Sequence, residues 1–157
     1  MIAHLVRSAD FERVLRTRTR VNSVHFAVHH VAGRPSAPGK PASKLVGAEL
    51  STGEKRIETP PVDDFARTAP DAVWLGTVVP KRHARRSVTR SLLKRQIHAA
   101  VMHHAASLAC GLWVVRLRAP FDRAHFVSAA SDALRRAARE ELESLIGSAA
   151  QRSAAGA

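Results

Sequence analysis

The sequence is poor in the residues that carry most metal and aromatic chemistry. Its single cysteine, Cys110, excludes an internal disulfide and any zinc site built on several thiolates. It has no tyrosine, and aromatic residues make up only 4% of the chain. That scarcity argues against a sheet that stacks splayed RNA bases on aromatic side chains.

Long apolar runs are absent as well. None approaches the roughly 18 residues of a membrane-spanning helix, and the N-terminus lacks the apolar core of a signal peptide. We therefore expect a cytoplasmic protein that makes no contact with a membrane.

Acidic residues are missing from a long internal stretch. No Asp or Glu occurs between Asp71 and Asp122. A metal-dependent nuclease needs clustered carboxylates to hold its ions, so the sequence argues against an autonomous nuclease of this kind. The Gly-x-Ser-x-Gly pattern of a nucleophile elbow is also absent. We predict that the protein itself contributes no catalytic residue.

The nine histidines offer another route to a metal site. His25 and His29 are four apart on an expected strand, which separates them by about 13 Å, too far to share one ion. His103 and His104 are adjacent in an expected helix and should point to different sides of it. We therefore interpret the histidines as ordinary surface or core residues and predict no metal site in the protein.

The acid-free stretch instead holds a dense run of cations between Pro80 and His98. The chain has 157 residues and a formal net charge of +12. A solvated face normally mixes charges of both signs. Cations this dense repel one another unless a polyanion lies beside them, and nucleic-acid phosphate is the obvious candidate. The residues expected to bind RNA are Lys81, Arg82, Arg85, Arg86, Arg90, Lys94, Arg95 and His98.

Part of this run has helical spacing, in a helix expected from Arg86 or Ser87 to about Ala106. Cations recur every four residues along one side, and the opposite side is apolar. Like charges at this spacing destabilise an isolated helix by a few tenths of a kcal/mol per pair, so the pattern favours an anionic partner. The cationic side holds Arg86, Arg90, Lys94 and His98, and the apolar side holds Val88, Leu92 and Ala99, with Leu93 and Ala100 towards its flank.

The other elements follow from periodicity. We expect a helix at 8–18, capped by Ser8 or Asp10, and strands at 24–31, 72–79 and 112–118. A last helix should run from an N-cap at Asp122 to about Ile146, with Phe126, Ala130, Leu134, Ala138 and Leu142 along one line. Gly147 should end it, leaving 148–157 as a disordered tail.

A long exposed insertion rich in Pro and Gly is expected at about 33–70, with a short strand at Leu45 to Leu50. The order α-β-β-α-β-α predicts an α/β (α+β) fold, a two-layer sandwich with a small mixed sheet. We expect one RNA-binding domain over residues 1–147.

Three stretches resemble the protein subunits of bacterial ribonuclease P. Leu75 to Arg82 is similar to the family's strand and Lys-Lys-type turn, and Ser87 to Arg95 to its helix with an Arg-Asn-Arg-x-x-Lys-Arg-type signature. The run Asp10-Phe11-x-x-Val14-Leu15 is similar to its N-terminal helix. The chain departs from the family at Ser91, Leu92 and His98, which stand where Asn, Arg and Arg are usual.

The resemblance implies both a topology and a function. The strand-helix-strand unit would cross over left-handedly. The protein would assist a catalytic RNA in the endonucleolytic removal of the 5′ leader from precursor tRNA, with catalytic groups and most Mg²⁺ sites on the RNA subunit and no small-molecule substrate. A cleft between the first helix and the sheet would contact the leader, and its candidate residues are Phe11, Leu15, Phe26 and His29, of which Phe26 is also a natural core residue.

Two alternatives share the basic face. A non-catalytic RNA-binding protein, such as a ribosomal protein, would show the same cations but has no reason for a cleft that binds a single-stranded leader. A DNA-reading helix fits less well, because a strand precedes Arg86 where a helix-turn-helix needs another helix.

Overall fold

A five-stranded mixed sheet forms the centre of the molecule, and the computed structural model describes residues 2–36, 72–128 and 131–155 of the chain. The strand order is β1-β4-β5-β3-β2. Strands β1, β4 and β5 are parallel to one another, whereas β3 is antiparallel to both β5 and β2. The strands are β1 (Ile2–His4), β2 (Val21–Asn22), β3 (Phe26–Val31), β4 (Val73–Val78) and β5 (Gly111–Leu117).

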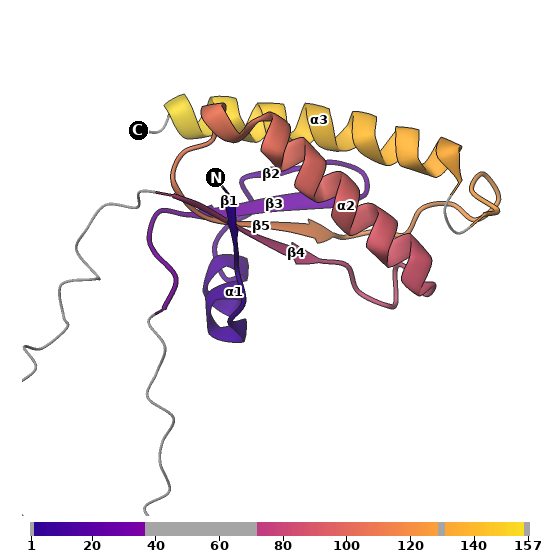
Figure 1. Ribbon diagram of the computed structural model, residues 1–157, viewed down its shortest axis with the longest axis horizontal. Helices are drawn as coiled ribbons and strands as arrows, with labels where there is room; N and C mark the ends of the chain where they lie inside the picture. Colours follow the sequence, from indigo (N-terminus) through magenta and orange to yellow (C-terminus); the bar gives the residue numbers. More distant parts are fainter. Residues whose placement is uncertain (1, 37–71, 129–130, 156–157) are drawn as a thin grey trace, which may run out of the picture.

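Helices cover both faces of this sheet unequally. Helices α2 (Ser87–His103) and α3 (Asp132–Ala155) lie on one face and form the helix layer of the expected sandwich, while the short α1 (Ser8–Leu15) lies on the other (Figure 1). A 3₁₀ turn, Ala105–Ser107, follows α2. The predicted α/β class is confirmed.

Apolar side chains are packed in two clusters, one on each face of the sheet, and β5 contributes to both. Trp113, Val115 and Leu117 point to the α2 and α3 side, and Leu112 and Val114 point to α1. All five side chains are buried. A strand that is apolar on both faces is what a central strand between two helix layers requires.

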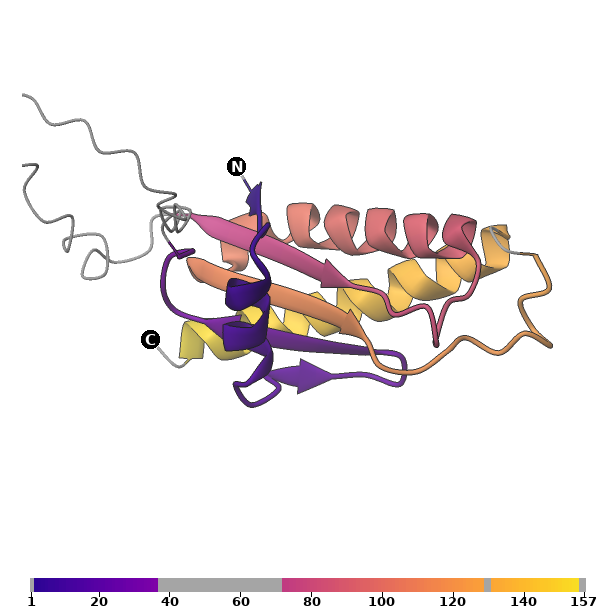
Figure 2. The same ribbon diagram turned by 90° about the horizontal axis from the view of Figure 1, so that it is seen from below.

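The crossover from β4 through α2 to β5 is left-handed. Seen from the α1 side, β4 and β5 run in the same direction, with β5 below β4 and α2 returning behind the sheet (Figure 2). Most β-α-β units are right-handed, so this topology is uncommon and agrees with the implication of the resemblance.

The last helix differs from the prediction at both ends. Asp122 accepts hydrogen bonds from the Ala124 N–H and His125 Nδ1 in a separate turn, so it does not begin the helix. Ser131 precedes α3 instead, and its hydroxyl accepts a bond of 3.1 Å from the Leu134 N–H, as an N-cap does.

Gly147 does not end α3, which continues to Ala155. Ala149, Ala150 and Ser153 are buried beyond that glycine. Their packing offsets the cost of a glycine inside a helix, about 1 kcal/mol, so residues 148–155 are not the tail that the sequence suggested. Leu134, Ala138 and Leu142 are buried as predicted, Phe126 precedes the helix, and Ala130 lies outside the described residues.

The first helix is shorter than expected, and Asp10 does not cap it. Asp10 is buried, and its carboxylate accepts bonds of 2.7–3.1 Å from the backbone N–H and hydroxyl of Ser36. Ser36, which belongs to the insertion expected at about 33–70, is therefore tied to α1. The rest of it, including the predicted short strand at Leu45 to Leu50, lies outside the described residues.

Two short edge strands were not predicted from the sequence. β1 has three residues and β2 has two. Neither is long enough to show alternation, and β1 pairs with β4, far away in the sequence. Their order is set by tertiary pairing, for which there is no local signal.

Glu141 joins α3 to the turn between β2 and β3. Its carboxylate accepts hydrogen bonds from the Ser23 hydroxyl, from the His25 N–H at 2.8 Å and from His25 Nδ1 at 2.7 Å. Burial by itself raises the pKa of Glu141, but these three hydrogen bonds outweigh burial and hold the pKa below its ordinary value. The charged form is therefore stabilised by folding.

Glu141→Gln should destabilise the protein at neutral pH by about 1.5–3 kcal/mol, because a charged acceptor is lost. Since the folded pKa is depressed, this stabilisation exists above the unfolded pKa of about 4.3 and is lost as pH falls below it. Urea unfolding at several pH values should show the gap between variant and parent closing in acid. The exposed neighbour Glu140→Gln serves as control, and a gap independent of pH would contradict the explanation.

Candidate nucleic-acid interface

The basic turn follows directly from the end of β4. Pro80 stops the strand, and its carbonyl accepts bonds of 3.1 Å from the N–H groups of His83 and Ala84. Ala84 is buried and anchors the turn in the core. Four cations of the turn are exposed as predicted: Lys81, Arg82, Arg85 and Arg86.

Arg90 fastens this turn to α2. Its guanidinium donates to the Ala84 carbonyl at 3.0 Å and to the Arg85 carbonyl at 2.7 Å, and the side chain is half-buried. Both carbonyls belong to the turn that leads into α2, so Arg90 holds that turn against the helix. Its first role is therefore structural, which was not predicted from the sequence.

Helix α2 is rotated by roughly a third of a turn from the predicted orientation. Val88 is 52% exposed and Ala99 is exposed, so neither belongs to the packed side as expected. Leu93, Ile97 and Val101 recur every four residues and identify the true stripe in the sequence. The buried residues of α2 are Leu92, Leu93, Ile97, Ala100 and Val101.

The rotation moves some of the expected cations. Lys94 and Arg95 are exposed, with Arg95 near the middle of the outward side. His98 is half-buried and stacks on His4 of β1, with ring centroids 5.4 Å apart. The outward cations of α2 are therefore Lys94 and Arg95, while Arg90 and His98 lie at its packed edges.

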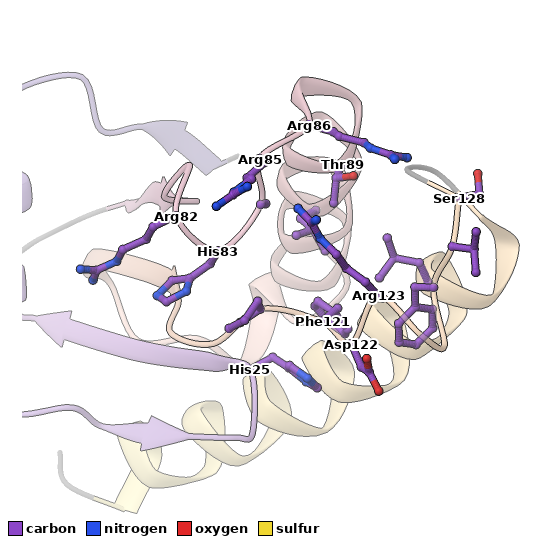
Figure 3. A pocket seen from close by; sticks show the side chains of 16 residues that line it. His25, Arg82, His83, Arg85, Arg86, Thr89, Phe121, Asp122, Arg123 and Ser128 are labelled. Carbon is purple, nitrogen blue, oxygen red and sulfur yellow. The ribbon is translucent and has the colours of Figure 1, made fainter.

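A pocket of about 820 Å³ opens between the basic turn, the start of α2 and the loop after β5 (Figure 3). Phe121 lies at its base and stacks on His25, with centroids 4.0 Å apart and planes 10° apart. Phe126 meets Phe121 edge-on. The cations that line the pocket include Arg82, Arg85, Arg86 and Arg123.

Phe121 and Arg123 were not predicted as site residues. Both flank Asp122, which was the predicted N-cap of the last helix and which ends the acid-free stretch. The charge pattern therefore gave no reason to single Arg123 out. Only the fold brings this loop to the basic turn.

The four candidates for a leader cleft do not all lie on one face. Phe11 of α1 packs so closely on Gly76 of β4 that a Cβ at Gly76 would clash with its ring. Leu15 is half-buried in the same α1 cluster. Phe26 is fully buried on the opposite face, beneath α2 and α3, so it is a core residue and not part of a cleft beside α1.

His29 lies on the α1 side but is only 4% exposed. Its Nδ1 is 3.2 Å from the Thr17 carbonyl, so we assign the proton to Nδ1. Burial, aided by the nearby charge of Arg116, lowers the pKa of His29 against the opposing effect of the Thr17 carbonyl. His29 is therefore neutral at pH 7 and too enclosed to present its ring face to a base.

The prediction that His103 and His104 point apart is wrong. His103 Nδ1 and His104 Nε2 both lie 2.9 Å from the same oxygen, Oε2 of Glu143. The hydrogen bond from His103, the largest effect, and the one from His104 together outweigh burial and lower the pKa of Glu143.

Comparison with known proteins identifies the family. The sequence profile of the Ribonuclease P family matches residues 2–142. The chain belongs to the ribonuclease P protein family. The ribonuclease P protein component of Paraburkholderia xenovorans is 29% identical over 149 residues, which is 95% of this chain and 81% of the relative. That of Bordetella parapertussis is 34% identical over 106 residues, which is 68% of this chain and 82% of the relative.

The ribonuclease P protein fold is also found in solved structures. The Staphylococcus aureus RNase P protein aligns with a TM-score of 0.51 over 92% of both chains, at 15% identity. A mutant of that protein aligns with a TM-score of 0.53, covering 92% of this chain and 85% of the mutant. These likenesses support the fold.

Membership of the ribonuclease P protein family fixes the broad role. The protein is a subunit of ribonuclease P, associates with ribonuclease P RNA and takes part in tRNA processing. The ribosomal-protein alternative is not favoured. Within the described ranges 2–36, 72–128 and 131–155, no helix is long and apolar enough to cross a membrane.

Two substitutions test the orientation of α2. Leu92→Ala should cost about 2–5 kcal/mol, because Leu92 is 3% exposed and the change leaves a cavity. Val88→Ala should cost less than about 0.5 kcal/mol, because Val88 lies at the surface. Chemical denaturation of the two variants measures both values. Equal costs, or a larger cost at Val88, would show that the helix is turned the other way.

Proposed function

We propose that the basic turn and the outward side of α2 dock the protein on the ribonuclease P RNA through its phosphates. The observation that carries this proposal is the exposed group of Lys81, Arg82, Lys94 and Arg95 in a stretch without any acid. Asp122, the first acid after the stretch, is already paired with His125 at 2.9 Å. RNA phosphate is the natural counter-charge for this surface.

The pocket beside the turn extends the same surface. Arg82, Arg86 and Arg123 line this pocket together with Phe121. Cations beside an aromatic ring suit a phosphate and its neighbouring base in an unpaired stretch of RNA. The proposed contact with the RNA subunit therefore includes the loop after β5 as well as α2.

The α1 side is the proposed contact for the 5′ leader of precursor tRNA. Phe11 and Leu15 remain candidates there, since both are partly accessible and lie on the face opposite α2. The reconstituted complex should bind precursor tRNA more tightly than mature tRNA. Phe11→Ala should reduce only the affinity for the precursor; equal losses for both RNAs would argue against leader contact.

Catalysis is proposed to belong to the RNA subunit, with Mg²⁺ held mainly by RNA phosphates. Two features of the chain support this division. The strand-turn-helix-strand unit contains no carboxylate, and Asp10 and Glu141, two partly or fully buried acids, are engaged in holding the fold. The protein then supplies affinity and orientation.

Replacing Lys94 and Arg95 together by Ala should weaken binding to the RNA subunit and flatten its salt dependence. The slope of log K against log salt should fall by roughly 0.7 to 0.9 for each phosphate that the variant no longer neutralises. Arg90 is left unchanged, because replacing it would also remove its hydrogen bonds to the turn, and a loss of stability could then be mistaken for a loss of RNA binding. Filter binding at several salt concentrations measures the slope.

The matched control removes the same charge from α3. Arg136 and Arg139 are exposed there, and their double Ala variant should keep the parent slope. An unchanged slope in the α2 variant, or the same decrease in the control, would mean that the cations of α2 do not contact RNA.

A further inference from the structure

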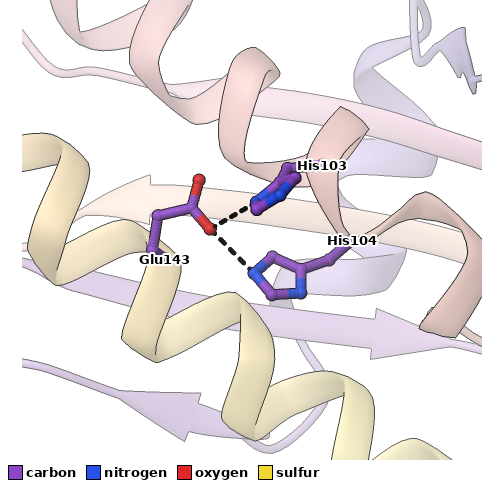
Figure 4. A group of neighbouring side chains, drawn as sticks. All are labelled: His103, His104 and Glu143. Carbon is purple, nitrogen blue, oxygen red and sulfur yellow. Dashed lines mark hydrogen bonds and ion pairs between the residues drawn. The ribbon is translucent and has the colours of Figure 1, made fainter.

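A second cluster of chemistry-bearing side chains lies at the far end of α2, away from the basic turn. His103 Nδ1 and His104 Nε2 each lie 2.9 Å from Oε2 of Glu143 on α3 (Figure 4). One ligand atom from each residue lies within 4.8 Å of the other two. This is the one such group of three in the described ranges 2–36, 72–128 and 131–155.

The end of the helix explains how adjacent residues converge. Neighbouring side chains on a continuous helix point about 100° apart. α2 ends at His103, and His104 has φ −97° and ψ 9°, outside the helical region. The ring of His104 is thereby turned towards α3, and the two imidazole centroids lie 5.2 Å apart.

Gly147 of α3 lies beside the ring of His104. A Cβ on Gly147 would lie 3.5 Å from Cε1 of His104, in ordinary contact with the ring. The His104 side chain is 25% exposed and that of Glu143 is 28% exposed, so the cluster is shielded on the α3 side but reachable from solvent through His103, at 72%.

Two imidazoles and one carboxylate are a ligand set that zinc takes, with a water as the fourth ligand. Zinc bonds to such atoms are about 2.0–2.2 Å long, which places tetrahedral ligand atoms about 3.4 Å apart. The observed 2.9 Å separations from Glu143 need to open by only about half an ångström. We propose that His103, His104 and Glu143 bind a divalent transition metal of the zinc type that clamps the end of α2 to α3.

The position favours a cation in a second way. The last carbonyls of α2 carry the negative end of its dipole, which stabilises positive charge nearby. The start and end of α2 are separated by about 24 Å, at 1.5 Å per residue, so the metal and the RNA surface do not compete for the same groups. The site is independent of the proposed function and of the Mg²⁺ that the RNA would hold.

Metal binding is tested on the full-length, untagged protein without RNA. Calorimetric titration with Zn²⁺ should give one ion per chain and raise the melting temperature, because the ion binds only the folded form. Co²⁺ should give the intense visible absorption of a tetrahedral site. Mg²⁺ should neither compete nor stabilise, because it prefers oxygen ligands in octahedral geometry.

The variants decide whether these three residues are the ligands. His104→Ala and Glu143→Gln should each weaken Zn²⁺ binding at least about tenfold and abolish the Co²⁺ band. His125→Ala is the matched control, since His125 also pairs with a carboxylate at 2.9 Å but has no third ligand atom among the described residues. Cys110→Ser controls for the exposed thiol.

Circular dichroism at the titration temperature establishes that each variant is folded, so that lost binding is not lost structure. Retained Zn²⁺ affinity in folded His104→Ala or Glu143→Gln would overturn the proposal. So would loss of binding in His125→Ala or Cys110→Ser, or the absence of one-to-one binding in the parent protein.

Discussion

Repulsion among the cations of the basic turn and α2 is the constraint to which the rest of the structure responds. The sequence between Asp71 and Asp122 provides no acid to relieve it. The fold holds these charges in place by other means: Leu93 and Ile97 are fully buried against the sheet and α3, and Arg90 donates to carbonyls of the turn. The energy needed to keep like charges together comes from apolar burial on the other side of the helix.

Helix α2, which carries Leu93 and Ile97, packs against α3 and is positioned by it. Glu141 ties α3 to the turn before β3 through Ser23 and His25. His25 in turn stacks on Phe121 at the base of the pocket. A chain of contacts therefore runs from α3 through one histidine to the loop that carries Arg123. This arrangement places cations from two distant parts of the sequence around one opening.

The two faces of the sheet are available for different tasks. One face is covered by α2 and α3, and the outward side of α2 carries the cations Lys94 and Arg95. The other is covered only in part by α1, and Phe11 lies directly against the β4 backbone at Gly76. A protein that contacts a large RNA on one side and a single strand on the other fits this division.

Much of the fold was predictable because its signals are local. The alternation in β3 predicted a strand, the apolar run of β4 predicted a central strand, and the basic motif predicted α2. The predictions that failed concern features set by tertiary contacts. Ser131 caps α3, where Asp122 was the predicted cap. The helix continues past Gly147 because Ala149 and Ala150 are buried.

The site shows the same pattern. The exposed cations of the turn followed from charge alone, but the rotation of α2 did not, because the prediction weighted the cations more than the Leu93, Ile97 and Val101 repeat. Phe26 was placed in the cleft by resemblance, although its strand alternation puts it on the face beneath α2 and α3. The convergence of His103 and His104 depends on a helix end that was predicted three residues too late, near Ala106.

The central claim is that the RNA performs the cleavage and this protein makes the RNA effective. The most direct measurement is cleavage of precursor tRNA at low Mg²⁺ by a bacterial ribonuclease P RNA, alone, with the protein, and by the protein alone. We expect fast removal of the 5′ leader only when RNA and protein are combined. Cleavage by RNA-free protein that is abolished by changing a single Asp or Glu would contradict this claim.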